Sequence, residues 1–133
     1  MNLKIIGAGG VGSWLLPALV KLYGNDSSST IEIWDKDILE PKNMDRQLFD
    51  KSDIGRTKAA ALADKYGRDV QCRVTAVCDY YTHGAMPPDL DDTWMFGCAD
   101  NHPARKEMLR TCDESEARCI IGGNEYEDAD AYY

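Results

Sequence analysis

The sequence predicts an α/β fold in which a mostly parallel β-sheet lies between two layers of helices. Short apolar runs rich in β-branched residues alternate along the chain with longer segments of helical periodicity. A glycine-rich turn joins the first apolar run to the first helical segment. At 133 residues, with 44% hydrophobic and 29% charged residues, the chain fits one globular domain over residues 1–133.

The first strand is predicted at Leu3–Ile6, and the first helix at Val11–Tyr23, where apolar residues recur at helical spacing. Pro17 lies inside this helix, and we expect it to kink the helix or to end its first turn, because proline has no amide hydrogen to donate. The polar segment Gly24–Ser29 predicts a loop, and the alternating run Thr30–Trp34 predicts the second strand.

The middle of the chain is less regular. Asp35–Asp53 is polar and contains Pro41, so we expect irregular structure with short helical turns. Ile54–Tyr66 predicts the second helix, with a small apolar face made of alanine and leucine. Val70–Val77 predicts the third strand.

The remaining elements follow the same alternation. Gly84–Pro88 predicts a loop, Thr93–Cys98 the fourth strand and Arg118–Ile121 the fifth. Between these strands, Pro103–Glu114 predicts a helix, with its proline suited to the first turn. The acidic, aromatic segment Glu125–Tyr133 leaves two interpretations open, a last strand without a hairpin partner or a frayed end.

In such a sheet, ligands bind beyond the carboxyl ends of the strands. The first loop there, Gly7-x-Gly9-x-x-Gly12, fits the fingerprint of a Rossmann-like dinucleotide site. The first glycine permits a tight turn, the second lets the backbone approach a phosphate, and the third lets helix and strand pack closely. Asp35 ends the second strand 23 positions after Gly12, where a ribose-binding acid is expected. A nicotinamide dinucleotide, a flavin dinucleotide and ATP all remain possible ligands at this point.

Four segments, in order, resemble the motifs of the ThiF/MoeB/HesA family, which are adenylating domains related to ubiquitin-activating enzymes. The family pattern is roughly G-x-G-G-x-G-S, D-x-D-x-x-x-x-x-N-x-x-R-Q, G-x-x-K and C-x-D-N-x-x-x-R. This chain has GAGGVGS, DKDILEPKNMDRQLF, DIGRTKAAALA and FGCADNHPARKEML. The resemblance spans about residues 3 to 124.

The resemblance implies that the chain uses ATP and Mg²⁺ to adenylate the C-terminal carboxylate of a ubiquitin-like or sulfur-carrier protein. Such a reaction needs positive charge around the phosphates and accurate positioning more than an acid–base pair. The resemblance assigns the nucleotide to the glycine loop, the ribose to Asp35, the phosphates to Asn43, Arg46 and Lys58, and magnesium to Asp100. The nucleotide-binding set is thus Gly7, Gly9, Gly10, Gly12, Asp35, Asp37, Asn43, Arg46 and Lys58, and the catalytic set is Arg46, Lys58 and Asp100.

Some of these residues have a structural alternative. Asp35 can cap a turn, Asp37 can be a turn residue rather than a second acid, and Arg46 can pair with the neighbouring Asp45 on the surface. Lys58, at the start of a helix, can be solvated, and Asp100 with Asn101 can cap the helix that follows.

Three further side chains have less direct expectations. Asn101 and Arg105 have supporting roles by the resemblance, with Arg105 pairing with a nearby acid or steering the incoming carboxylate. Cys98 is interpreted as a packing residue rather than a nucleophile.

Family domains are about twice this length. Their later strands, thioester-forming cysteine, paired zinc cysteines and an arginine donated from before the first strand have no counterpart here. We therefore expect an incomplete adenylation domain that binds ATP and adenylates slowly or not at all. A non-catalytic nucleotide-binding or partner-docking subunit is the alternative. An NAD-dependent oxidoreductase is a third hypothesis, which Arg46, Lys58 and Asp100 disfavour because hydride transfer has no use for that set.

Composition limits the partners and the location. The net charge of −8 disfavours binding to nucleic acid or to an anionic membrane. No apolar run reaches the roughly 20 residues of a membrane span and no leader precedes the first strand, so we expect a cytoplasmic protein. The five cysteines form no C-x-x-C pair and predict mostly buried free thiols. An unpaired final strand would predict a homodimer formed partly by residues 120–133.

Overall fold

The computed structural model describes residues 1–85, 90–124 and 129–132, with side chains over residues 1–85 and 90–122. Six strands form one sheet in the order β3-β2-β1-β4-β5-β6. The first five are parallel to their neighbours, and β6 runs antiparallel to β5. The strands are β1 Asn2–Ile6, β2 Thr30–Trp34, β3 Arg73–Val77, β4 Thr93–Gly97, β5 Arg118–Asn124 and β6 Ala129–Tyr132.

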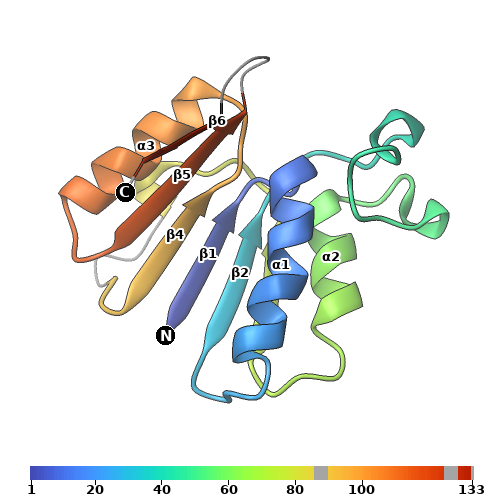
Figure 1. Ribbon diagram of the computed structural model, residues 1–133, viewed down its shortest axis with the longest axis horizontal. Helices are drawn as coiled ribbons and strands as arrows, with labels where there is room; N and C mark the ends of the chain where they lie inside the picture. Colours follow the sequence, from blue (N-terminus) through green and yellow to red (C-terminus); the bar gives the residue numbers. More distant parts are fainter. Residues whose placement is uncertain (86–89, 125–128, 133) are drawn as a thin grey trace.

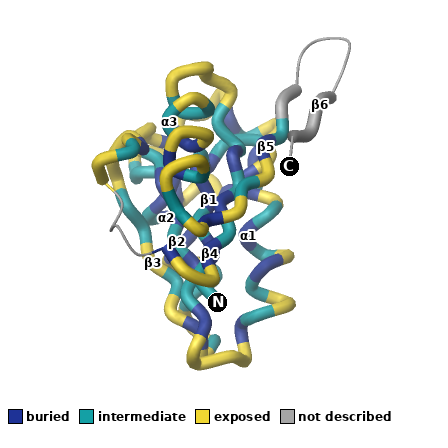
Figure 2. Tube along the Cα trace, turned by 90° about the vertical axis from the view of Figure 1, so that its left-hand side faces the viewer, coloured by how far each residue is buried: buried dark blue, intermediate teal, exposed yellow. Residues whose placement is uncertain are grey.

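Three helices complete the layers. Figure 1 shows α1 and α2 on one face of the sheet and α3 behind β4 and β5, and the turned view of Figure 2 places α1 and α3 on opposite sides. The helices are α1 Gly10–Tyr23, α2 Lys58–Tyr66 and α3 His102–Asp113. This arrangement confirms the predicted Rossmann-like three-layer α/β fold with a mostly parallel sheet.

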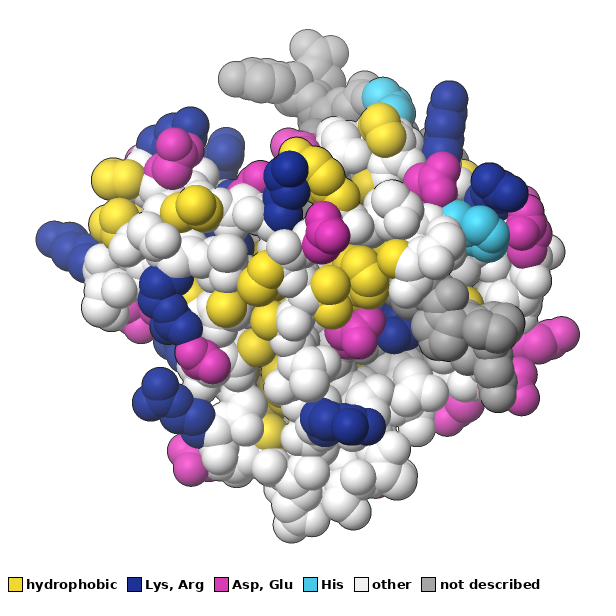
Figure 3. Space-filling view, turned by 180° about the vertical axis from the view of Figure 1, so that it is seen from behind, with side chains coloured by type: hydrophobic (Ala, Val, Ile, Leu, Met, Phe, Trp, Pro, Cys, Tyr) yellow, Lys and Arg dark blue, Asp and Glu magenta, His cyan; other side chains and the backbone are white. Residues whose placement is uncertain are grey.

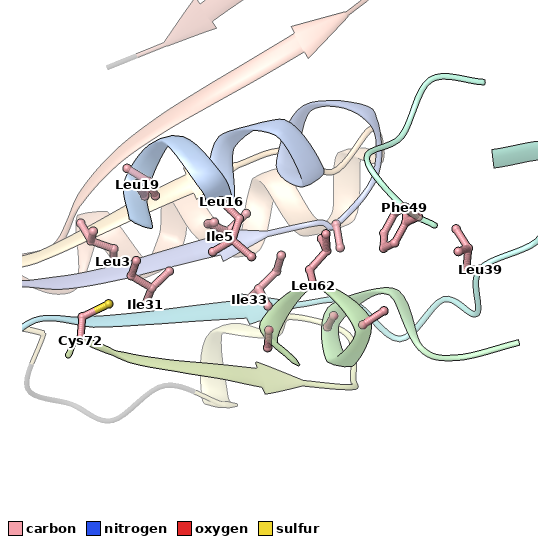
Figure 4. Close-up of a cluster of buried hydrophobic side chains, with 14 residues drawn as sticks. Leu3, Ile5, Leu16, Leu19, Ile31, Ile33, Leu39, Phe49, Leu62 and Cys72 are labelled. Carbon is pink, nitrogen blue, oxygen red and sulfur yellow. The ribbon is translucent and has the colours of Figure 1, made fainter. Parts of the chain in front are cut away.

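Two clusters of buried side chains hold the layers together. Because successive strand residues point to opposite faces, Ile5 belongs to the cluster under α1 and α2, and Ile6 to the cluster under α3. Leu16 of α1 and Leu62 of α2, neither with any exposed surface, fill the first cluster (Figure 4). Met108 of α3 fills the second.

The register brings the ends of four strands into one line. Ile6 pairs with both Trp34 and Gly97, and Trp34 pairs with Val77, so β1, β2, β3 and β4 end level with one another. The loops that leave these strands therefore start side by side at one edge of the sheet. That edge is where a ligand is expected in a parallel sheet.

Two predicted boundaries were wrong, and of the two alternatives for Pro17 the structure excludes an end of the helix there. The second helix begins at Lys58 and not at Ile54, because Gly55 has φ +88° and Thr57 is extended in a bridge to Ile38. The third strand begins at Arg73 rather than Val70. The first helix continues through Pro17 and keeps 14 residues. The expected helical turns between the second strand and second helix are confirmed as 3-10 turns at Pro41–Asn43 and Lys51–Asp53.

The C-terminal segment differs from the expectation of an unpaired strand. Residues 129–132 pair with residues 121–124 of β5 as an antiparallel ladder, so β5 supplies the hairpin partner that the sequence did not predict. The fifth strand is accordingly longer than predicted and reaches Asn124. The expected loop at Gly84–Pro88 lies partly outside the described residues, and its described part belongs to a 3-10 turn at His83–Ala85.

The surface is charged, and the helices and cysteines bear on the expectations from composition. Lys, Arg, Asp and Glu side chains are spread over the face seen from behind in Figure 3. Within the part of the chain that the structure describes, no helix is long and apolar enough to cross a bilayer. All five cysteines are free, as expected: Cys72 is buried, Cys98, Cys112 and Cys119 are partly buried against the core clusters, and Cys78 is exposed.

Candidate functional site

A cleft of about 580 Å³ lies beyond the carboxyl ends of β1, β2, β3 and β4. Its lining comes from the loops after these strands, from residues 40–47, and from the first turns of α2 and α3. Nine of the ten residues predicted for nucleotide and metal binding line this one cleft. They are Gly7, Gly9, Gly10, Asp35, Asp37, Asn43, Arg46, Lys58 and Asp100.

The tenth predicted residue, Gly12, supports the cleft from behind. A Cβ atom at Gly12 would lie 1.8 Å from the Gly7 carbonyl oxygen. Gly7 itself has φ +104°, and a Cβ atom there would lie 2.7 Å from the Ala99 amide nitrogen. Only glycine fits at these two positions, and it lets α1 press against the end of β1.

Gly9 and Gly10 differ from this pair because a Cβ atom there meets nothing closer than 3.8 Å. Packing within the chain does not require glycine at either position. Both residues border the cleft, where α1 starts at Gly10. The missing side chains leave the first-turn amides of α1 open to the cleft, and such amides attract anions.

Asp35 is held in place by two backbone amides. Ala8 donates its amide to Oδ2 at 2.7 Å, and Asp37 donates its amide to Oδ1 at 2.7 Å. Burial raises the pKa of Asp35 above its ordinary value, while the two amide hydrogen bonds act in the opposite direction. The structural and functional alternatives therefore coexist, because this carboxylate fixes the glycine turn and also borders the cleft.

Lys58 is buried although it opens α2, with 7% of its surface exposed. Its Nζ lies 3.7 Å from Asp37 Oδ2, and its amide donates to the Asp37 carbonyl at 2.9 Å. The alternative of a solvated surface lysine was wrong. Asp37 lies beside the lysine and provides an acidic partner for it, so the two predicted residues form one unit at the floor of the cleft.

Asn43 and Arg46 lie on the segment between β2 and α2, which contacts the start of α1 where Trp14 Nε1 donates to the Arg46 carbonyl at 3.4 Å. Asn43 is buried and its Oδ1 accepts a hydrogen bond from the Glu40 amide at 3.0 Å, which fixes the amide group beside the cleft. Arg46 is exposed and, among the described residues, has no ion-pair partner. The alternative of a surface pair with Asp45 is therefore not found, and the guanidinium group is available at the rim of the cleft.

Gln47 is a cleft residue that the sequence interpretation missed. It is 8% exposed, and its Oε1 has no hydrogen-bond partner among the described residues. Its Nε2 lies 3.8 Å from the position of a Cβ atom on Gly9. A buried amide oxygen without a partner is costly, and this one belongs to a residue that lines the cleft beside the glycine turn. Its position directly after Arg46 in the R-Q motif was the signal available.

The residues in and after the loop that follows β4 make different contacts. Asn101 Oδ1 accepts from the Ala104 amide at 2.9 Å, so Asn101 is the cap of α3. Asp100 is exposed at the cleft and free of that role. Arg105 donates from Nε to the Ala99 carbonyl at 3.4 Å and also lines the cleft. Burial raises the pKa of Cys98 to about 12, so its thiol stays protonated, as expected for a packing residue.

The other end of the cleft is aromatic, which was not predicted. Trp34 and Tyr81 pack edge to face with ring centroids 5.7 Å apart. Lys36 Nζ lies 3.9 Å from the centroid of the exposed Tyr80 ring, in a cation–π contact. These rings line the cleft on the side of β3, beyond Asp35. A flat aromatic ligand can pack there while a charged group reaches the glycine turn.

The donor set suits a metal held jointly with a ligand. Within the described residues, no group of three or more His, Cys, Asp or Glu side chains is arranged to hold a metal ion. Magnesium differs from zinc because it commonly takes one or two carboxylates and completes its shell with phosphates and water. The exposed Asp100 carboxylate at the cleft therefore fits magnesium only together with a phosphate ligand.

Comparisons with known proteins agree with this arrangement. A sequence profile of the ThiF family matches residues 1–127. No curated protein matches the chain. The match covers every predicted site residue.

Several solved structures share the fold. The tRNA N6-threonylcarbamoyladenosine dehydratase TcdA of E. coli, in complex with ATP, has a TM-score of 0.73 and 22% identity, covering 90% of this chain and 49% of its own. E. coli MccB, with MccA, has a TM-score of 0.74 and 22% identity, covering 92% and 37%. PaaA has a TM-score of 0.76 and 18% identity, covering 98% and 44%. The chain thus spans less than half the length of these three proteins.

Proposed function

This chain belongs to the ThiF family, and on that premise we propose that it binds ATP and adenylates the C-terminal carboxylate of a ubiquitin-like or sulfur-carrier protein. One observation carries the proposal. A single cleft contains a glycine turn at a helix N-terminus, a fixed carboxylate and several cations, among them Lys58 and Arg46. This set suits a nucleoside triphosphate, with each part of the ligand facing a group of matching chemistry.

The proposed orientation of ATP follows from the two ends of the cleft. The triphosphate lies at the glycine turn, where α1 amides, Asn43 and the Gln47 amide face it. Asp35 accepts hydrogen bonds from the ribose hydroxyls, since each of its oxygens keeps a lone pair after binding one amide. The adenine packs against the aromatic end at Tyr80 and Tyr81.

The proposed reaction is a substitution at the α-phosphorus. A carboxylate oxygen of the carrier forms a bond to this phosphorus, and the bond to the bridging oxygen breaks. Pyrophosphate leaves with that electron pair, and an acyl adenylate remains. Negative charge grows on the leaving oxygens, where Lys58 and Arg46 stabilise it without any proton transfer. Asp37 Oδ2, 3.7 Å from Lys58 Nζ, holds the lysine side chain in position.

Asp100 would hold magnesium together with the phosphates of the bound nucleotide. When bound, the ion neutralises phosphate charge and favours departure of pyrophosphate. Asn101 caps α3 and thereby fixes the backbone that carries Asp100. Arg105, tied to the Ala99 carbonyl, lies where it can steer an incoming carboxylate.

Solved structures of similar proteins support ATP as the nucleotide, and the substrate is to be identified by experiment. TcdA has been crystallised with ATP and with AMP, and MccB with MccA. We extend the nucleotide to this chain and retain a protein C-terminus as its target. We also propose that the protein works as a homodimer in the cytoplasm. ATP binding without turnover would instead identify a non-catalytic nucleotide-binding or partner-docking subunit.

Calorimetric titration of the protein with ATP and with NAD, each with and without magnesium, tests the nucleotide. We expect magnesium-dependent binding of ATP and no measurable binding of NAD. NAD binding tighter than that of ATP would overturn the proposal. Carrier-dependent exchange of pyrophosphate into ATP then tests the reaction, with a ubiquitin-like protein and a sulfur carrier tried separately.

Asp100→Ala tests the metal role in the same titration. We expect the variant to lose the magnesium dependence of ATP binding and to keep its melting temperature, because Asp100 is exposed and does not cap α3. Asp113→Ala, an exposed carboxylate at the far end of α3, serves as the matched control. Unchanged magnesium dependence in Asp100→Ala would remove the residue from the metal site.

A further inference from the structure

The connection between β3 and β4 has little regular structure of its own. It joins two parallel strands that β2 and β1 separate in the sheet, a step that usually takes a helix. Among its described residues, 78–85 and 90–92, the only helical structure is the 3-10 turn at His83–Ala85. Tyr80 and Tyr81 of this connection line the aromatic end of the cleft. The position of that end therefore depends on what holds the connection in place.

One hydroxyl group of α3 holds the connection. Thr111 is 2% exposed, and its Oγ1 forms a hydrogen bond with the Tyr81 hydroxyl. The same oxygen lies 2.9 Å from His83 Nδ1 and donates to the Glu107 carbonyl at 2.9 Å. A hydroxyl has one proton and two lone pairs, so these three partners satisfy it completely. A residue without a hydroxyl at this position would remove the partner of a buried phenol.

His83 adds two further contacts with the same helix. Its backbone amide donates to Glu107 Oε2 at 2.9 Å, and its Nε2 lies 2.9 Å from Glu114 Oε2. Together with the contact to Thr111, these hold one residue of the connection at three points along α3 and its C-terminal end. The His83 side chain is 26% exposed, and hydrogen bonds that are partly shielded from water are stronger than those in full contact with it.

Tyr81 extends these contacts to the cleft. It is 5% exposed and packs edge to face on Trp34, the last residue of β2. Burial raises the pKa of Tyr81 to about 12, so the phenol keeps its proton at neutral pH. Trp34 precedes Asp35, whose carboxylate borders the same cleft. The hydrogen bond to Thr111 thus fixes a ring that lies next to the residues proposed to hold ribose and adenine.

The helix α3 links this ring to the other side of the cleft. Ala104, Met108 and Thr111 lie three and four positions apart, so they share the face of α3 that packs toward Tyr81. Ala104 also lines the cleft, in the first turns of the same helix. Because α3 is continuous from His102 to Asp113, it holds the aromatic end of the cleft at a fixed separation from the α3 end.

We propose that Thr111 and His83 are positioning residues of the nucleotide site, which hold Tyr81 where the adenine of ATP packs. Neither side chain lines the cleft, so both act through Tyr81. The inference rests on the proposed ATP function and identifies what determines the geometry of its base-binding end. Both residues lie outside the four motif segments of the sequence.

Calorimetric titration with ATP and with tripolyphosphate separates the two ends of the cleft, because tripolyphosphate has neither base nor ribose. Thr111→Val removes the hydroxyl and keeps the shape of the side chain. We expect its affinity for ATP to fall about tenfold and its affinity for tripolyphosphate to equal that of the wild type, since only the adenine end loses support. Thr111→Ser keeps the hydroxyl and should bind ATP as the wild type does.

Two further variants complete the comparison. His83→Ala changes a partly exposed side chain, and we expect a smaller loss of ATP affinity, about threefold, because Tyr81 keeps its bond to Thr111. Thr93→Val is the matched control, since Thr93 is also 2% exposed but begins β4 at the end of the sheet away from the cleft. It should change neither affinity. Equal losses of ATP and tripolyphosphate affinity in Thr111→Val, or no loss of either, would overturn the proposal.

Quenching of Trp34 by acrylamide tests the role of Thr111 without any nucleotide. With Trp14→Phe and Trp94→Phe as background, Trp34 is the only tryptophan left in the chain, and it is 7% exposed beside Tyr81. Thr111→Val should raise its quenching constant about twofold, because the released Tyr81 ring uncovers it.

Thr111→Ser and Thr93→Val should leave this quenching constant unchanged. Unchanged quenching in Thr111→Val would overturn the proposal, because Tyr81 would then be held without the hydroxyl. A wild type that binds no ATP would overturn the proposed function, whereas the quenching measurement decides independently whether Thr111 holds Tyr81. The two failures are therefore distinguishable.

Discussion

At the scale of single residues, the cleft contains polar side chains of which two have no partner within the described part of the chain. Gln47 keeps a buried amide oxygen without a partner, and Arg46 has no described counter-ion. Lys58 is buried, with an acidic group 3.7 Å away. Sequence motifs identified the cations and the acids. They did not identify Gln47 as a cleft residue, because the burial of its side-chain amide depends on how the segment between β2 and α2 folds against α1.

Replacing Gln47 by leucine should affect stability and binding in opposite directions. Leucine fills a similar volume and removes the unpaired oxygen, so the free energy of unfolding without nucleotide should rise by about 1 kcal/mol. ATP binding should weaken about tenfold, because the amide that faces the phosphates is lost. Thermal unfolding and calorimetry measure the two effects. Gln71→Leu, at an exposed glutamine, should change neither; weaker stability in Gln47→Leu would show that the oxygen is already paired.

At the scale of elements, the position of α1 decides whether the cleft exists. Gly12 lets the helix start within contact of the Gly7 carbonyl, and Gly9 leaves its first turn open. The sequence assigned both glycines to one fingerprint. The structure separates them, because packing inside the chain requires glycine at position 12 and does not require it at position 9.

Gly12→Ala and Gly9→Ala form a matched pair that tests this separation. The Cβ atom of the first would lie 1.8 Å from a carbonyl oxygen, and that of the second 3.8 Å from a side-chain nitrogen. Gly12→Ala should lower the free energy of unfolding by about 3 kcal/mol, since α1 must move away from β1. Gly9→Ala should melt within a few degrees of the wild type and bind ATP more weakly. Equal melting temperatures for the two variants would contradict the packing role of Gly12.

The same scale shows what sequence patterns can and cannot predict. All five parallel strands were predicted, with errors at the start of β3 and the end of β5, because each is a short apolar run bounded by polar residues. The start of α2 was not, since Ile54 continues an apolar pattern while Gly55 takes φ +88° and redirects the chain. The pairing of β6 with β5 was missed as well, because a strand that pairs on one side carries little periodicity of its own.

At the scale of the whole molecule, the fold and the cleft depend on each other. The level ends of four strands bring together residues that are up to 93 positions apart in the sequence, from Gly7 to Asp100. Order along the chain predicted which of them belong to one site. The aromatic end of the cleft could not be predicted in this way, because the sequence pattern around Trp34, Tyr80 and Tyr81 is equally typical of core residues.

Binding that involves so many separate segments should stabilise the entire domain. Magnesium and ATP at 100 times the dissociation constant should add about 2.7 kcal/mol to the free energy of unfolding, provided that only the folded state binds. For a chain of 133 residues this corresponds to a rise in melting temperature of about 10 °C. We expect that rise in thermal scans with magnesium and ATP together, a smaller one with ATP alone and none with NAD. A rise with NAD equal to that with ATP would show that the cleft does not select the nucleotide we propose.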